Sequence, residues 1–347
     1  MRFKLDPANF DSCPQFNQWI DESHEEERGP LEVFSFKPRP SEVLFQMSRN
    51  TYTTAFSDFL AKYDEELKRT VTEGFPSPIA HYFYRFEHGY ESYLQRLHFL
   101  RDTWEAMIDV LHALEVGEIR HMGLALAEPI KLHHLLSDKV ADRLSNIERI
   151  VAAATAAGVR LSVGKVAPQP VLEKMHELNR TRNAFSHSAA QSEAQARTWI
   201  SECDEDVLGI LDDVRTLEEC SLFRYIGQTD GSTLRCETFK GHGFTRTIQL
   251  LSLTADQVRE SQRYFQQGQI LAVHDGRLFS VRPFIYFRED AAGHMTKLCV
   301  FRKTRGDAPN RRIEFAVVGD SVSMDENRAT FKAEIDELRA LFGLGAD

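Results

Sequence analysis

Apolar residues recur every three or four positions through the middle of the chain, from residue 53 to about residue 220. This spacing places apolar side chains along one face of a helix. Short connections between such segments are typical of a bundle of antiparallel helices. The pattern therefore predicts a bundle of four or more helices, including the segments 53–71, 79–116, 137–158 and 193–220.

The pattern changes after Ser221. Short segments rich in β-branched and aromatic residues alternate with Gly and Asp turns, which is typical of antiparallel strands. The stretch "HDGR" at 274–277 predicts a tight hairpin between two of them. Helical patterns at 254–268 and 327–343 interrupt and follow the strands.

These patterns predict an α+β protein in three parts. The first 48 residues are turn-rich and polar, and we expect them to be irregular apart from a short strand in "LEVFSF". Residues 1–75 would then form an N-terminal extension with one helix. Residues 76–220 would form an all-α bundle, and 221–347 a smaller, mainly antiparallel β domain with inserted and C-terminal helices.

Composition favours a globular cytoplasmic protein. Hydrophobic residues make up 42% and charged residues 27% of the 347 positions. No run of roughly eighteen apolar residues occurs, and the N-terminus has no apolar leader. The five cysteines are widely spaced without a CxxC pair, which predicts unpaired thiols rather than disulfides or a zinc site.

The charge is unevenly distributed along the chain. The segment from Ser221 to Arg312 holds fifteen Lys and Arg against eight Asp and Glu, a surplus of +7. The whole chain carries −10, so the remaining residues carry −17. A basic surplus in the predicted β domain favours a surface that attracts phosphate, although the net charge argues against tight nonspecific binding of nucleic acid.

The stretch "HELNRTRNAFSHSA" at 176–189 concentrates Arg, Asn and His in a helical context. Ribonucleases that use no metal need a base for the 2′-OH proton, an acid for the leaving 5′ oxygen and positive charge beside the phosphorane. His187 suits the acid and base roles at neutral pH, and Arg182 suits the third. One copy of each is too few, so two copies facing each other across a dimer interface would supply the set.

The segment "ELNRTRNAFSHS" resembles the Arg-(x4 to x6)-His signature of the HEPN superfamily, the higher-eukaryote and prokaryote nucleotide-binding helical domains. The resemblance covers residues 79–220. It implies that Arg182 and His187 are the catalytic pair of an endoribonuclease, a hydrolase that cuts RNA without metal or cofactor, and that Asn183 orients them. It further implies a homodimer through this helix, a toxin–antitoxin or antiviral defence role, and an antitoxin or other protein as partner.

Other readings of these residues remain open. HEPN-like chains also include non-catalytic dimeric interaction proteins, nucleotide sensors and accessory subunits, in which the Arg and His only tie helices together. Glu177 and Arg180 are candidate substrate contacts, with exposed helix positions as the alternative. Arg282 and Arg288 in "LFSVRPFIYFRED" are candidate RNA contacts, although a strand with a solvated face has the same pattern. The remaining histidines lack the spacing of a metal site.

Overall fold

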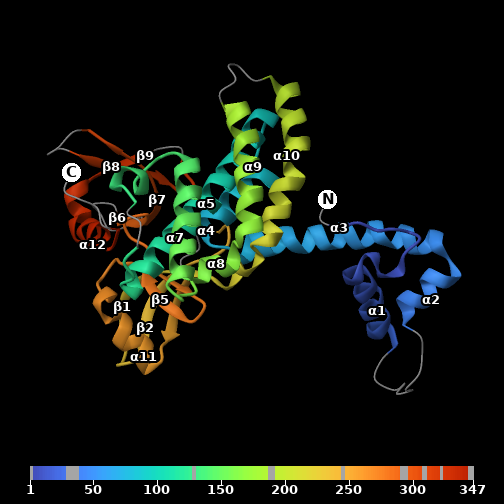
Figure 1. Ribbon diagram of the computed structural model, residues 1–347, viewed down its shortest axis with the longest axis horizontal. Coiled ribbons are helices and arrows are strands. Elements are labelled where there is room, and N and C mark those ends of the chain that lie inside the picture. The colour runs from blue at the N-terminus through green and yellow to red at the C-terminus, as the bar shows by residue number, and fades with distance from the viewer. Residues whose placement is uncertain are drawn as a thin grey trace. The chain divides into compact units, whose positions relative to one another are not determined.

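The computed structural model describes residues 3–28, 39–126, 130–186, 192–243, 247–289, 296–306, 311–320 and 323–342 (Figure 1). The chain divides into two compact units, Met1–Arg69 and Thr70–Asp347, which we call unit 1 and unit 2. The boundary between them falls within helix α3 (Arg49–Gly74). No helix of the described residues is long and apolar enough to cross a membrane.

Unit 1 contains more helix than the sequence pattern predicted. Helices α1 (Pro14–Arg28) and α2 (Pro40–Met47) occupy part of the segment that we expected to be irregular, and "LEVFSF" lies outside the described residues. Phe16 is fully buried against the rings of Tyr52 and Phe59 from α3. Unit 1 therefore has an aromatic core, which the turn-rich composition of its first 48 residues did not indicate.

Unit 2 begins with a helical bundle built around α5 (Tyr93–Met122). Helices α4 (Ser77–His88), α7 (Val140–Ala156), α8 (Ser162–Val166) and α10 (Glu193–Asp213) all contact α5. Helix α9 (Gln169–Ser186) packs against α7 and α10 (Figure 1). The short helix α6 (Leu132–Leu135) contacts α7. The continuous apolar pattern over 79–116 is divided into α4 and α5, because the Ser92 hydroxyl accepts the Gln95 backbone N–H and starts a new helix.

The strands of unit 2 form two sheets in which every neighbouring pair is antiparallel. The first has the order β3-β2-β1-β4-β5 and the second β6-β7-β8-β9. Their bounds are β1 Ser221–Gln228, β2 Thr233–Phe239, β3 Thr247–Ser252, β4 Ile270–His274, β5 Arg277–Ser280, β6 Ile285–Glu289, β7 Thr296–Arg305, β8 Arg312–Val317 and β9 Ser323–Asn327.

Turn chemistry and capping match the sequence signals in this region. Asp275 and Gly276 both have positive φ, 48° and 74°, as the two central residues of a tight hairpin turn between β4 and β5 require. Helix α11 (Ala255–Ser261) starts at a capping box made by Thr254 and Gln257. Helix α12 (Lys332–Phe342) follows the last strand. The predicted α+β layout is therefore confirmed.

Polar groups of α5 connect the bundle to both sheets. Every residue from Thr103 to Arg120 is buried. The Glu118 carboxylate pairs with Arg277 of β5, and Arg120 donates to the Ser280 carbonyl. A helix buried on all sides needs partners for its polar side chains. Strand β5 supplies partners for Glu118 and Arg120, and Arg302 of β7 donates to Glu105, so the bundle and both sheets share one interior in unit 2.

Candidate functional site

Helix α9 carries Arg182 on its inward face. Its buried apolar residues are Val171, Leu172, Met175 and Leu178, and of these Val171, Met175 and Leu178 are three or four positions apart along one face. Arg182 continues the same spacing by four residues, so it lies on the same face of the helix. Its side chain is consequently only 21% exposed.

Two side chains hold the Arg182 guanidinium. Its Nη2 donates to the carboxylate of Glu105 on α5. Its Nη1 donates to Oδ1 of the neighbouring Asn183, at 2.9 Å. Glu105 is buried, so the ion pair lies at the edge of the bundle interior. These contacts fix both the position and the orientation of the guanidinium.

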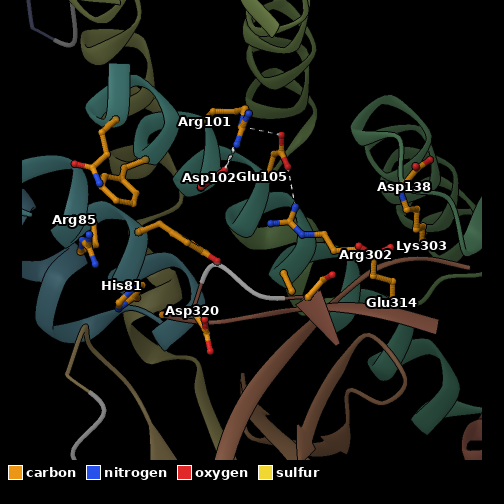
Figure 2. A pocket seen from close by; sticks show the side chains of 16 residues that line it. His81, Arg85, Arg101, Asp102, Glu105, Asp138, Arg302, Lys303, Glu314 and Asp320 are labelled. Atoms are coloured by element: carbon orange, nitrogen blue, oxygen red, sulfur yellow. Dashed lines mark hydrogen bonds and ion pairs between the residues drawn. The ribbon is translucent and has the colours of Figure 1, made fainter. Parts of the chain in front are cut away.

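The Glu105 carboxylate is shared by three arginines. Arg302 of β7 donates from Nη1 at 2.8 Å, and Nε of Arg101 lies 3.7 Å away, one turn earlier on α5. Figure 2 shows Glu105 between Arg101 and Arg302. Burial acts to raise the pKa of Glu105, but the guanidiniums of Arg302, Arg182 and Arg101 hold that pKa below its ordinary value. Glu105 is therefore a carboxylate anion at neutral pH.

The other predicted site residues in this part of the chain are Glu177, Arg180 and His187, and the first two do not share the inward-facing position of Arg182. His187 lies outside the described residues, so its pairing with Arg182 stays a prediction. Glu177 and Arg180 are exposed, away from the buried stripe. Neither side chain has an ion-pair partner among the residues that the structure describes. Both are accessible to a ligand that approaches α9 from solvent.

The two predicted arginines of the sheet region already have carboxylate partners. Arg282 Nε lies 3.0 Å from Glu334 of α12, and its side chain is 15% exposed. Arg288 Nη1 lies 3.1 Å from Glu326 of β9, and its side chain is 44% exposed. Within the described parts of the chain, no hydrogen bond or ion pair joins either arginine to α9. Arg288 is the more accessible of the two to RNA.

Glu105 also lines an open cavity of about 630 Å³. One wall comes from α4 and α5, and the other from β7, β8 and the turn that follows β8 (Figure 2). Four cationic side chains line it: Arg85, Arg101, Arg302 and Lys303. Burial lowers the pKa of His81, another lining residue, to about 4, so that imidazole is neutral at pH 7.

Sequence reasoning missed this cavity. In the run "FRKTR" at 301–305, four of the five residues are basic or aromatic, and this composition could have indicated a phosphate-binding strand. Arg101, Glu105 and Asp109 recur every four residues on α5, a spacing that indicates a polar row on one helix face. Neither signal reveals that the two segments face each other, because that proximity arises from tertiary packing alone.

Among the described residues, no group of three or more His, Cys, Asp or Glu side chains could hold a metal ion. The five cysteines are buried and unpaired. Comparisons with family models, with curated proteins and with solved structures found no match to this chain. The sequence motif and the geometry around Arg182 and Glu105 are therefore the features that bear on function.

Proposed function

We propose that the protein is a metal-independent endoribonuclease of the HEPN type that acts as a homodimer. The observation that supports this most is the anchoring of Arg182 by Asn183 and Glu105, five positions before His187 in the chain. A guanidinium that is held in one orientation can stabilise a developing phosphorane without reorganising first.

In the proposed reaction, His187 takes the proton of the RNA 2′-OH, and the 2′ oxygen attacks the adjacent phosphorus. Arg182 stabilises the negative charge of the phosphorane. The bond from phosphorus to the 5′ oxygen then breaks, and the protonated imidazole of the partner subunit's His187 gives that oxygen a proton. The products are a 2′,3′-cyclic phosphate and a 5′-hydroxyl, and no metal takes part in the steps.

Of the substrate contacts proposed around this centre, Glu177 and Arg180 are exposed, Arg288 is partly exposed and Arg282 is mostly buried. Arg180 would bind an RNA phosphate, and Glu177 would orient Arg182 or a histidine across the dimer. Arg288 and Arg282 would extend the contact along the sheet region, where the +7 surplus of residues 221–312 lies. Toxin or defence effectors require control of such an activity, so an antitoxin or another protein partner is part of the proposal.

The chemistry of the products tests the proposal. Purified protein incubated with RNA in EDTA should yield fragments that end in 2′,3′-cyclic phosphate and begin with 5′-hydroxyl. Sedimentation under the same conditions should give a dimer. Fragments with 5′-phosphate and 3′-hydroxyl ends, or cleavage that requires Mg²⁺, would contradict the mechanism.

One observation favours a second candidate, a non-catalytic dimeric interaction protein. Arg182 is paired with a buried carboxylate, which is also the arrangement of an arginine that joins two helices. Under this alternative, Arg182→Ala lowers the free energy of unfolding while the wild-type protein cuts no RNA. The alternative would be excluded if the wild-type protein cuts RNA and Arg182→Lys abolishes the cleavage without changing stability.

A further inference from the structure

We propose that the cavity between α4, α5 and the β6–β9 sheet binds a phosphorylated small molecule of nucleotide size, and that this ligand is coupled to Arg182 through Glu105. The binding site stands on the geometry of unit 2 alone. The effect of the ligand on RNA cleavage rests on the proposed function.

The charges of the cavity favour an anion. Three of the lining carboxylates have a cation from the protein: Asp102 pairs with Arg101 at 2.8 Å, Asp320 with Lys297 at 3.0 Å, and Glu314 with Arg305. Glu105 pairs with three arginines, as described above. Among the described residues, the lining carboxylate without such a partner is the exposed Asp138.

Two of the cationic side chains that line the cavity form no ion pair with a carboxylate of the described residues. Among the residues that the structure describes, Arg85 and Lys303 have no carboxylate within ion-pair distance. The positive charge of Arg302 is only partly neutralised, because Arg302 shares the single carboxylate of Glu105 with Arg101 and Arg182. Arginine and lysine side chains that line a recess can each hold phosphate oxygens. Figure 2 shows Arg85 and Lys303 in opposite parts of the cavity, a separation that suits an extended ligand rather than a single phosphate.

Aromatic side chains supply a second kind of contact. Phe99 and Tyr82 line the cavity and are each partly exposed. The Arg85 guanidinium lies 4.7 Å from the centre of the Phe99 ring, so charge and aromatic surface are adjacent. A flat heterocycle stacks favourably on such a surface. The volume of about 630 Å³ lies within the range of sites for small molecules and cofactors.

Glu105 provides the coupling to Arg182. Its Oε2 accepts from Arg302 on the cavity side at 2.8 Å, and its Oε1 accepts from Arg182. A bound phosphate competes with Glu105 for Arg302. The carboxylate then interacts more strongly with Arg182, which leaves that guanidinium less available to an RNA phosphate. A ligand in the cavity should therefore inhibit RNA cleavage.

Calorimetric titration of the full chain tests the binding. The probes are adenosine 5′-monophosphate, adenosine and inorganic phosphate. We expect the monophosphate to bind at least about tenfold more tightly than either fragment, because only it engages both the cations and the aromatic surface. Binding of inorganic phosphate or adenosine with the same affinity, or no binding of the monophosphate, would overturn the proposal.

Variants locate the site. Lys303→Gln should weaken binding of the monophosphate about tenfold, whereas Arg312→Gln, an exposed cation on the neighbouring strand outside the cavity, should leave it unchanged. Equal effects of the two changes would mean that only general charge attracts the ligand, and would overturn the assignment. Thermal unfolding of both variants confirms that each is folded.

The coupling has a readout that does not depend on catalysis. Coupling between two sites is reciprocal, so removing Arg182 must change the affinity of the cavity. In Arg182→Ala, Glu105 holds Arg302 more strongly, and the monophosphate should bind severalfold more weakly. Unchanged affinity would overturn the coupling. If no RNA is cut by the wild-type protein but the affinity changes as expected, the proposed function fails and this inference stands.

Discussion

Glu105 and Arg182, 77 positions apart in the chain, form an ion pair that joins α5 to α9. The same carboxylate accepts from Arg302, 197 positions away on β7. One buried anion thus connects the helix that carries the sequence motif with the sheet that walls the cavity. A substitution of Glu105 should therefore alter both the position of Arg182 on α9 and the wall of the cavity at Arg302.

Replacing Glu105 by Gln should destabilise unit 2. The change leaves Arg101, Arg182 and Arg302 close together without their shared anion, and we expect a loss of about 3–5 kcal/mol in the free energy of unfolding at pH 7. Urea denaturation measures this loss. Glu177→Gln, at an exposed glutamate on α9, is the control and should change stability by less than about 0.5 kcal/mol.

The effect of Glu105→Gln should also depend on pH. The folded pKa of Glu105 is lowered, so its ionised form stabilises the folded state above the unfolded pKa of about 4.3, and this contribution disappears as pH falls through the folded pKa. The difference between wild type and variant should therefore be constant above about pH 5 and shrink in more acidic solution. A difference that grows on acidification would contradict the ion-pair account.

Glu115 on α5 should behave in the opposite way. Its side chain is fully buried, and neither carboxyl oxygen has a hydrogen-bond partner among the described residues. Burial, with a smaller contribution from Glu118, raises the pKa of Glu115 well above its ordinary value. The unfolded chain ionises first, so this group costs stability as pH rises above the unfolded pKa, at up to about 1.4 kcal/mol per pH unit until the folded pKa is reached.

Glu115→Gln should therefore stabilise the protein at pH 8 and have a smaller effect at pH 5, as measured by urea denaturation at both values. Glu118→Gln is the matched control one turn away. It loses the ion pair with Arg277 and one of the two oxygens that accept from Ser162, so it should destabilise at both pH values. A gain from Glu115→Gln that is the same at pH 5 and pH 8 would show that ionisation plays no part.

Gly117 of α5 lies close against β5. A Cβ at this position would lie 2.7 Å from the Ser280 carbonyl oxygen and 2.9 Å from the Phe279 ring. Because the backbone oxygen cannot move without disturbing the sheet, Gly117→Ala should cost about 1–3 kcal/mol. Gly227→Ala, where a Cβ would meet nothing within 4 Å, is the control. Equal thermal stability of the two variants would contradict this packing.

Much of the fold was predictable from the sequence, because apolar spacing and turn residues act locally. Asp275 and Gly276 specify their hairpin by backbone conformation, and Thr254 specifies the start of α11. The core of unit 1 was not predicted, since Phe16 and Tyr52 belong to segments whose contact depends on tertiary packing.

The candidate site, like the fold, has one part that could be predicted from the sequence and one part that could not. Arg182 and Asn183 are neighbours in the sequence, and their contact could be expected. The role of Glu105 could not, because an acidic residue on a long helix pattern is most often exposed. Its partners Arg182 and Arg302 converge on it only once the bundle and the second sheet have packed together.

The rate of RNA cleavage in EDTA tests the central claim most directly. Wild-type protein should cut RNA, Arg182→Ala and His187→Ala should lose at least about a hundredfold in rate, and Arg180→Ala, an exposed arginine of the same helix, should retain cleavage chemistry with at most weaker RNA binding. Circular dichroism of each variant establishes that the helices are intact. Equal cleavage by wild type, Arg182→Ala and His187→Ala would contradict the claim that these two residues form the catalytic centre.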